Sequence, residues 1–173
     1  MKKQDILENR AKVVYLAIGS NLGNKVYNIE ITKIELEKYK IKILKSSSKY
    51  LSESWPDNTK PKFINSVIKV KTYLEPFQLL KVCKIIEFKM GRVKTKINAP
   101  RICDIDIIDY DQKLLNEKKK NLILPHPRMD NRIFVLLPLF EIEKSWKHPE
   151  TKINIVKLIS SLPVKDLRSI KQI

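Results

Sequence analysis

The stretch that opens the expected fold reads Val13-Val14-Tyr15-Leu16-Ala17-Ile18-Gly19. A short apolar run with several β-branched residues, closed by a glycine, is typical of a buried strand. Residues 20–24 are mostly polar and contain a second glycine, so they predict a turn directly after this strand. From residue 25 to residue 39 apolar side chains recur among charged ones at helical spacing, which predicts an amphipathic helix.

Further elements follow outward from this strand, turn and helix. Runs with strand character lie at residues 41–52, 63–70 and 103–110. A second helix is expected from residue 74 to residue 90, because Pro76 suits a first turn and Gly91 suits an end. Irregular loops are expected at residues 53–62 and 92–101, where prolines and polar residues interrupt the apolar pattern.

The order of these elements predicts the fold class. Strand, helix, strand, strand, helix, strand, with both helices available to one face of a sheet, is the ferredoxin-like arrangement. We therefore expect an α+β protein with a ferredoxin-like βαββαβ core, an antiparallel sheet and helices packed on its faces. A strand at 122–124, a helix at 131–142 interrupted at Pro138, and a helix at 155–161 predict a C-terminal helical extension. Residues 1–12 are expected to form a flexible N-terminal extension, and residues 13–173 a single domain.

Composition limits the kinds of protein that this sequence can be. Of the 173 residues 43% are hydrophobic, which is enough for a core that needs no disulfide or metal. Cys83 and Cys103 show no CxxC spacing, which indicates two reduced, buried thiols. There is no signal-like start and no apolar run near the ~20 residues that cross a bilayer. We expect a soluble cytoplasmic protein with no membrane partner.

The charge is strongly positive. Thirty-five Lys and Arg stand against 19 Asp and Glu, giving a net charge of +16. Such an excess suits a nucleic-acid binder, and it also suits a protein that attracts a small polyanion such as a nucleotide. The lysines are spread along the chain and seldom alternate with aromatic residues, so charge alone does not distinguish these two kinds of protein.

The sharpest chemical signal is the pair of aspartates in Asp104-Ile105-Asp106. Residues two apart on a strand share a face, so both carboxylates project together while Cys103, Ile105 and Ile107 point into the core. Two neighbouring carboxylates that leave open positions suit Mg²⁺, which binds nucleotide phosphates and keeps waters. A solvated face of an edge strand is the alternative interpretation of this pair.

Basic residues surround that pair in the sequence. Arg92 follows the glycine that ends the second helix, and Arg101 stands three residues before Asp104. Guanidinium groups bind phosphate oxygens bidentately, and phosphoryl transfer is catalysed mainly by positioning and charge stabilisation. Alone, each arginine is an ordinary surface charge; next to the aspartates, the group indicates phosphoryl transfer. His126, between two prolines, suits either a structural hydrogen bond or a phosphate contact.

A second set of residues suits a flat polar ligand. Gly19 allows close approach of a ligand to the backbone, and Asn65 is a polar residue within an apolar strand. A buried amide must be satisfied, either by a turn or cap partner or by a ligand with a donor–acceptor edge. Phe63 and Phe134 are candidates to sandwich a ring, or they are ordinary core residues.

These residues fall into motifs that occur together in one known family. The motifs are Ala17-Ile18-Gly19-Ser20-Asn21-Leu22-Gly23, Phe63-Ile64-Asn65-Ser66-Val67, Ala99-Pro100-Arg101 with Asp104-Ile105-Asp106, and Pro125-His126-Pro127-Arg128-Met129 through Arg132-Ile133-Phe134-Val135-Leu136. In order and spacing the chain resembles the 6-hydroxymethyl-7,8-dihydropterin pyrophosphokinases, over residues 13–148.

The resemblance implies an activity, cofactors and site residues. It implies transfer of pyrophosphate from ATP to 6-hydroxymethyl-7,8-dihydropterin in folate biosynthesis, with release of AMP, by a monomer that uses two Mg²⁺ ions and binds no nucleic acid. It implies that Asp104 and Asp106 hold the metal ions and that Arg92 and Arg101 act in catalysis. The implied ATP-binding residues are Glu87, Lys94, Arg101, His126 and Arg132, and the implied pterin-binding residues are Gly19, Ser52, Trp55, Phe63, Asn65 and Phe134.

The chain departs from the family pattern in the basic loop. Well-known members carry a tryptophan near the position of Asn98, and Lys94 stands where an arginine is frequent. We keep two other functions open: a basic ferredoxin-like module that binds RNA, and a family member that has lost activity. The missing RNA-binding signature argues against the first, and the retained Asp104, Arg92 and His126 argue against the second.

Overall fold

A computed structural model describes residues 10–54, 57–92 and 99–173 of the chain. Its main sheet is antiparallel throughout, in the order β5-β1-β4-β3-β8, with β2 also paired to β4. The strands of this sheet are β1 (Lys12–Ser20), β2 (Lys42–Ser46), β3 (Tyr50–Ser52), β4 (Phe63–Thr72), β5 (Asp104–Tyr110) and β8 (Ile170–Gln172). A separate hairpin pairs β6 (Leu115–Glu117) with β7 (Leu122–Leu124).

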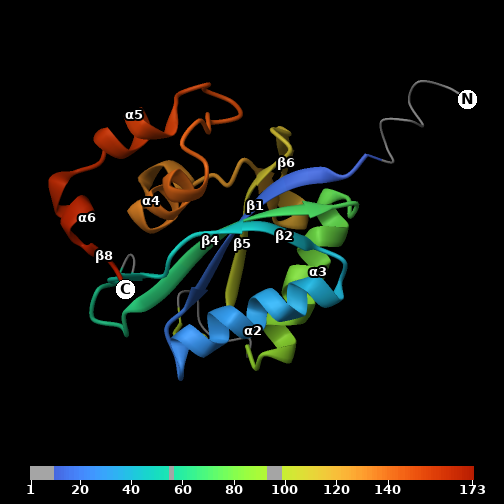
Figure 1. Cartoon of the computed structure of the whole chain (residues 1–173), viewed down its shortest axis with the longest axis horizontal. Coiled ribbons are helices and arrows are strands. Elements are labelled where there is room, and N and C mark those ends of the chain that lie inside the picture. The colour runs from blue at the N-terminus through green and yellow to red at the C-terminus, as the bar shows by residue number, and fades with distance from the viewer. Residues whose placement is uncertain (1–9, 55–56, 93–98) are drawn as a thin grey trace, which may run out of the picture.

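Helices cover both faces of the sheet, as Figure 1 shows. They are α2 (Lys25–Lys38), α3 (Pro76–Lys89), α4 (Ile133–Ile142), α5 (Ile155–Ser160) and α6 (Val164–Arg168), with 3-10 turns η1 (Lys118–Lys120) and η2 (Met129–Asn131). One buried cluster joins α2 and α3 to the face that carries Leu16, Ile18 and Ile105. A second cluster joins α4 and α5 to the face that carries Tyr15 and Val67. None of the described helices has the length and apolar character needed to cross a bilayer.

The predicted positions of the first two helices are confirmed, and local contacts explain where they begin and end. Asn24 caps α2, because its side chain accepts a hydrogen bond from the Tyr27 N–H at 3.1 Å. Pro76 is the first residue of α3, and the Gln78 side chain accepts from the Glu75 N–H at 2.9 Å. Gly91 follows α3 with φ +90, a conformation that favours glycine. Mixed α/β architecture with an antiparallel sheet is therefore what the sequence predicted.

The expected strand at 41–52 is in fact two strands. Ser47 lies between β2 and β3 and is buried, and its Oγ accepts a hydrogen bond from the Val67 N–H at 3.0 Å. A side-chain hydroxyl thus takes the place of a backbone acceptor, and the ladder on β4 is interrupted there. A register shift between Ile43 and Lys45 bends β2 as well.

Other boundaries also differ from expectation. The expected interruption at Pro138 was wrong, since α4 runs through it. A proline inside a helix costs about 3 kcal/mol, but α4 buries Leu136, Leu139 and Ile142, each worth about 1.5–3 kcal/mol. Helix α6 and strand β8 were not predicted, and β1 begins at Lys12, the last residue of the expected N-terminal extension.

Candidate active site

The two aspartates lie on β5 and share one face of the sheet. Asp104 pairs with Gly19 and Asp106 pairs with Ala17 on β1. Ala17 also pairs with Val67 on β4, and Val67 packs in the cluster below α4. Paired residues on neighbouring strands point to the same side. Both carboxylates therefore lie on the face that α4 covers in part.

Asp104 is held by two arginines. Arg92 Nη1 donates to its Oδ1 at 2.7 Å, and Arg101 Nη2 donates to its Oδ2 at 2.5 Å. Burial by itself would raise the pKa of the Asp104 carboxyl, but the guanidinium groups of Arg101 and Arg92 lower that pKa below its ordinary value. Asp104 is therefore an ionised carboxylate whose two oxygens both meet cations.

Glu87 supports this arrangement from α3. It is 2% exposed, and its Oε1 accepts from the Ile105 N–H at 2.9 Å, between the two aspartates. Its Oε2 lies 2.7 Å from Arg92 Nη1, the same atom that meets Asp104. Lys84 Nζ reaches both of its oxygens, at 2.9 and 3.0 Å. The buried carboxylate holds Arg92 and the start of β5 together.

Asp106 faces a second basic group, which the β7–α4 connection supplies. Arg132 Nη1 donates to Asp106 Oδ2 at 3.1 Å, and His126 Nε2 lies 3.6 Å from the same oxygen. His126 Nδ1 accepts from the Arg128 N–H at 3.2 Å, so the ring proton belongs on Nε2, toward Asp106. Burial lowers the pKa of His126; the Asp106 charge opposes this shift and the arginines Arg132 and Arg128 add to it.

The residues assigned to a flat ligand also come together. Asn65 pairs with Gly19 across β4 and β1, and Ser52 pairs with Phe63 across β3 and β4. Asn65 Nδ2 donates to Ser52 Oγ at 2.8 Å. A Cβ added at Gly19 would lie 3.1 Å from Asn65 Oδ1 and 3.4 Å from Phe63 Cδ1, so any side chain there would crowd both groups.

Arginines connect this polar and aromatic set to the carboxylates. The Arg101 guanidinium lies over the Phe63 ring, 5.3 Å from its centroid, and that of Arg132 lies 5.6 Å from the Phe134 centroid. Arg101 Nε is buried and has no hydrogen-bond partner among the described residues. A buried donor without an acceptor is costly, so its orientation suits an incoming acceptor such as a phosphate or a ring carbonyl.

The set of residues at the site differs in part from the set expected from the sequence. Trp55, Lys94 and Asn98 lie outside the described residues. Lys84 and Asn21 were not predicted as site residues. Lys84 was open to discovery from its spacing, because it stands one helical turn before Glu87 on α3. Asn21 was visible only as a member of the motif at residues 17–23, since a turn asparagine by itself is ordinary.

Two polar residues near the site are structural. Asp109 is buried and its Oδ2 accepts from Trp146 Nε1 at 2.9 Å, which ties β5 to the segment after α4. His148 is buried as well, and its Nδ1 accepts from the N–H groups of Glu150 and Thr151 at 3.2 and 3.1 Å.

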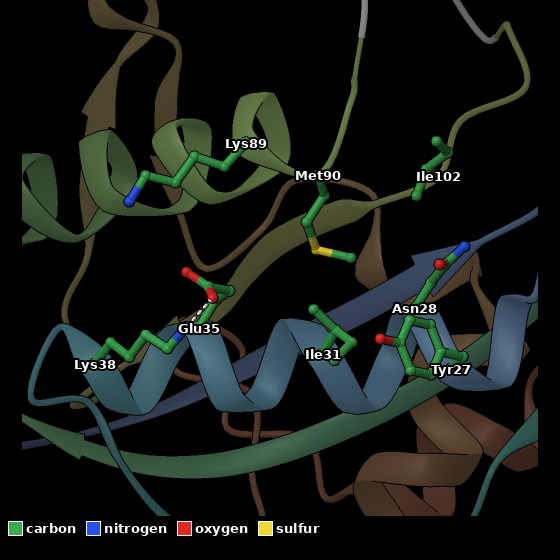
Figure 2. Close-up of a pocket in the computed structure, with 8 residues that line it drawn as sticks. All are labelled: Tyr27, Asn28, Ile31, Glu35, Lys38, Lys89, Met90 and Ile102. Atoms are coloured by element: carbon green, nitrogen blue, oxygen red, sulfur yellow. Dashed lines mark hydrogen bonds and ion pairs between the residues drawn. The ribbon is translucent and has the colours of Figure 1, made fainter.

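A groove of about 560 Å³ lies elsewhere, between α2 and the end of α3. Figure 2 shows Met90 pointing across the groove toward Ile31. Ile102 lies on the side of Asn28, away from Lys38. The groove contains none of the residues assigned to ATP or pterin. It is a feature of the helical layer, whereas the Asp104 and Asp106 carboxylates lie on the α4 face of the sheet.

Comparison with known proteins identifies the family. The model of the 7,8-dihydro-6-hydroxymethylpterin-pyrophosphokinase (HPPK) family matches residues 15–144. The chain is 38% identical to the 2-amino-4-hydroxy-6-hydroxymethyldihydropteridine pyrophosphokinase of Aquifex aeolicus over 136 residues, 79% of this chain and 83% of that protein. It is 39% identical to folic acid synthesis protein fol1 of Pneumocystis carinii over 171 residues, 98% of this chain and 22% of that protein.

Several relatives are much longer than this chain. It spans only 22%, 22% and 21% of the folic acid synthesis proteins of P. carinii, Dictyostelium discoideum and Schizosaccharomyces pombe. A solved structure of Plasmodium falciparum HPPK-DHPS with pteroate has a TM-score of 0.70 and 17% identity, over 88% of this chain and 42% of that one. That likeness extends to the fold alone. From the family match and the A. aeolicus relative, the chain belongs to the 7,8-dihydro-6-hydroxymethylpterin-pyrophosphokinase family.

Proposed function

We propose that this chain transfers the terminal pyrophosphoryl group of ATP to 6-hydroxymethyl-7,8-dihydropterin in folate biosynthesis. The hydroxymethyl oxygen forms a bond to the β-phosphorus, and the bond from that phosphorus to the oxygen bridging to the α-phosphate breaks. AMP leaves with the bridging oxygen, and the hydroxyl proton is released. This reaction suits a site that positions two substrates and stabilises phosphate charge without a covalent intermediate.

One observation carries the proposal: a carboxylate pair among cations adjoins a pocket of amide and aromatic groups. Arg101 belongs to both, since it donates to Asp104 and lies over Phe63. The triphosphate end of one substrate and the hydroxymethyl end of the other would therefore meet near Arg101. Such adjacency is what an in-line transfer between two bound molecules requires.

The protein's own residues are assigned as follows. Arg92 and Arg101 bind phosphate oxygens and stabilise the charge that develops during transfer. His126 and Arg132 bind nucleotide phosphate beside Asp106, and Glu87 holds Arg92 in place from below. Lys94 keeps its expected role as a further ATP-binding residue.

We assign the magnesium sites to Asp104 and Asp106, and their surroundings fit that metal. Both side chains are partly exposed and share a face. No group of three or more His, Cys, Asp or Glu in the described part of the chain has metal-binding geometry. Among the described residues the site offers a pair of hard oxygen ligands, which suits Mg²⁺ ions that take their other ligands from water and phosphate. Two bound Mg²⁺ ions would supply positive charge to the triphosphate.

The pterin is assigned to Gly19, Ser52, Phe63, Asn65 and Phe134, with Trp55 as the expected further contact. Asn65 presents one amide edge, and its Nδ2 is already oriented by Ser52. A pterin ring carries donors and acceptors along one edge, which a fixed amide recognises. The Phe63 and Phe134 rings would supply stacking surface once the arginines above them turn to phosphate.

We infer that the core is the ferredoxin-like fold, with α4 to α6 as a C-terminal helical extension. Strand order β5-β1-β4-β3 with α2 and α3 on one face supports this inference. The extension also bears on the RNA-binding alternative. Ferredoxin-like RNA modules stack bases on an open sheet face, but here α4 and α5 bury Tyr15, Val67 and Ile108 on that face.

We propose a cytoplasmic monomer that binds no nucleic acid and no membrane. Residues 13–173 are proposed to be one pyrophosphokinase domain, preceded by a short extension. Size-exclusion chromatography with light scattering tests the monomer, because a dimer would double the measured mass.

The activity is tested by AMP formation from ATP, Mg²⁺ and 6-hydroxymethyl-7,8-dihydropterin. We expect AMP and the pterin diphosphate in equal amounts, and neither when pterin is omitted or EDTA is added. Folded protein that makes no AMP would refute the proposal. AMP without pterin would indicate ATP hydrolysis instead, and would equally overturn it.

A further inference from the structure

Asn21 joins three segments that are far apart in the sequence. It is 2% exposed and follows the end of β1. Its N–H donates to the Arg101 carbonyl at 3.1 Å, and its Oδ1 accepts from the Arg101 N–H at 2.7 Å. Its Nδ2 donates to the Pro61 carbonyl at 3.2 Å. A single side chain thus links β1, the segment before β4 and the segment before β5.

Only an amide fits this position in full. The Arg101 N–H requires an acceptor and the Pro61 carbonyl requires a donor, and a carboxamide supplies one of each. A carboxylate supplies two acceptors and would face the Pro61 carbonyl oxygen with another oxygen. An apolar side chain would leave the part-buried Arg101 N–H without its acceptor, next to a residue that is itself buried, which is costly.

The main chain that Asn21 holds belongs to Arg101, on which the site depends. Two hydrogen bonds, one to the Arg101 N–H and one to the Arg101 carbonyl, fix the position of the Cα between them. From there the guanidinium reaches Asp104 and covers Phe63, and its buried Nε remains without a partner among the described residues. Displacing this backbone would move the guanidinium, and with it the contact to Asp104, the contact to Phe63 and the position of Nε.

We infer that Asn21 is a positioning residue for the transfer step, acting through Arg101. The inference rests on the proposed function and extends it. Asn21 need not touch either substrate, because its effect is to place the Arg101 guanidinium where phosphate and pterin meet. A misplacement of about 1 Å by a remote change is enough for a loss of ~100-fold.

The test is a double-mutant cycle between Asn21 and Arg101. Turnover is measured for wild type, Asn21→Ala, Arg101→Ala and the double variant, at saturating ATP, Mg²⁺ and pterin. Asn24→Ala serves as the matched control, because it removes a side-chain hydrogen bond from the same turn without touching Arg101. Circular dichroism and a thermal melt accompany each variant. If Asn21→Ala does not fold, Asn21→Ser, which keeps a polar side chain in the turn but is one group too short to replace the Oδ1 acceptor of Arg101, takes its place in the cycle.

We expect Asn21→Ala to lower kcat by about 100-fold in the wild-type background and by little in the Arg101→Ala background. Asn24→Ala should keep wild-type turnover. A loss of equal factor in both backgrounds, or wild-type kcat in Asn21→Ala, overturns the inference while the proposed function stands. Absence of AMP from the wild-type protein overturns the proposed function and this inference with it.

Discussion

Asp106→Asn is the substitution that separates catalysis from folding most cleanly. It keeps the size and shape of the side chain and removes its charge. Arg132 Nη1 loses an ionised acceptor at 3.1 Å, and His126 Nε2 loses a negative neighbour at 3.6 Å. The pairing of β5 with β1 should persist, because Asp106 pairs with Ala17 through the main chain and the carboxylate takes no part in that pairing.

The expected losses differ in size because the environment is half open. The Asp106 side chain is 32% exposed, so solvent screens its ion pair and the loss of stability should be about 1 kcal/mol or less. In a domain of this size that corresponds to a fall in Tm of about 2–4 °C. Removing one preorganised charge-stabilising group from a transfer site costs about 2.7–4 kcal/mol, or 10²–10³ in kcat.

The assay compares AMP release and thermal unfolding for wild type, Asp106→Asn and Asp111→Asn. Asp111 lies at the end of the same strand, where its carboxylate meets exposed Arg10 at 3.3 Å, and its φ of +49 suits asparagine. We expect Asp111→Asn to keep wild-type turnover. Turnover of Asp106→Asn near the wild-type value, or an equal loss in both variants, would refute the assignment of Asp106 to the transfer site.

Three further outcomes are expected. Asn65→Ala should raise KM for the pterin about tenfold, the value of one lost buried hydrogen bond, and leave KM for ATP unchanged in the same steady-state assay. Glu143→Gln should lower the free energy of unfolding by about 1 kcal/mol at pH 7. Because the Lys69 hydrogen bond lowers the pKa of Glu143 in the folded protein, this difference, measured by urea titration, should vanish as the pH falls below about 4. Burial raises the pKa of Cys83 to about 12 and that of Cys103 to about 11, so at pH 8 both thiols should react with a disulfide reagent only after unfolding.

Much of the fold was accessible from the sequence, because local signals and burial agree. The positions of α2 and α3 and the alternation along β5 each have a local cause, and the structure confirms them. The errors occur where tertiary contacts decide. Ser47 interrupts a strand through a hydroxyl contact to β4, and the burial of α4 outweighs the cost of Pro138. Strand β8 has no apolar pattern of its own and exists because the edge of β3 is available to it.

The candidate site was predictable in composition but not in connection. Spacing was enough to place Asp104 and Asp106 on one face, and the register confirms it. Spacing said nothing of which cation meets which carboxylate. Arg92 and Arg101 both meet Asp104, whereas Arg132 meets Asp106. Such pairings depend on how loops return to the sheet, and Asn21 shows that a residue without chemical signal can fix that return.

The charges within this cluster nearly cancel. Within the described residues three carboxylates, those of Glu87, Asp104 and Asp106, meet four permanent cations, Lys84, Arg92, Arg101 and Arg132. The surplus is a single positive charge, so the cluster is nearly neutral. A nucleotide triphosphate carries more negative charge than one surplus cation offsets. If the cluster binds ATP as proposed, it must therefore gain cations with the nucleotide, and a carboxylate pair is the part of the cluster suited to hold them.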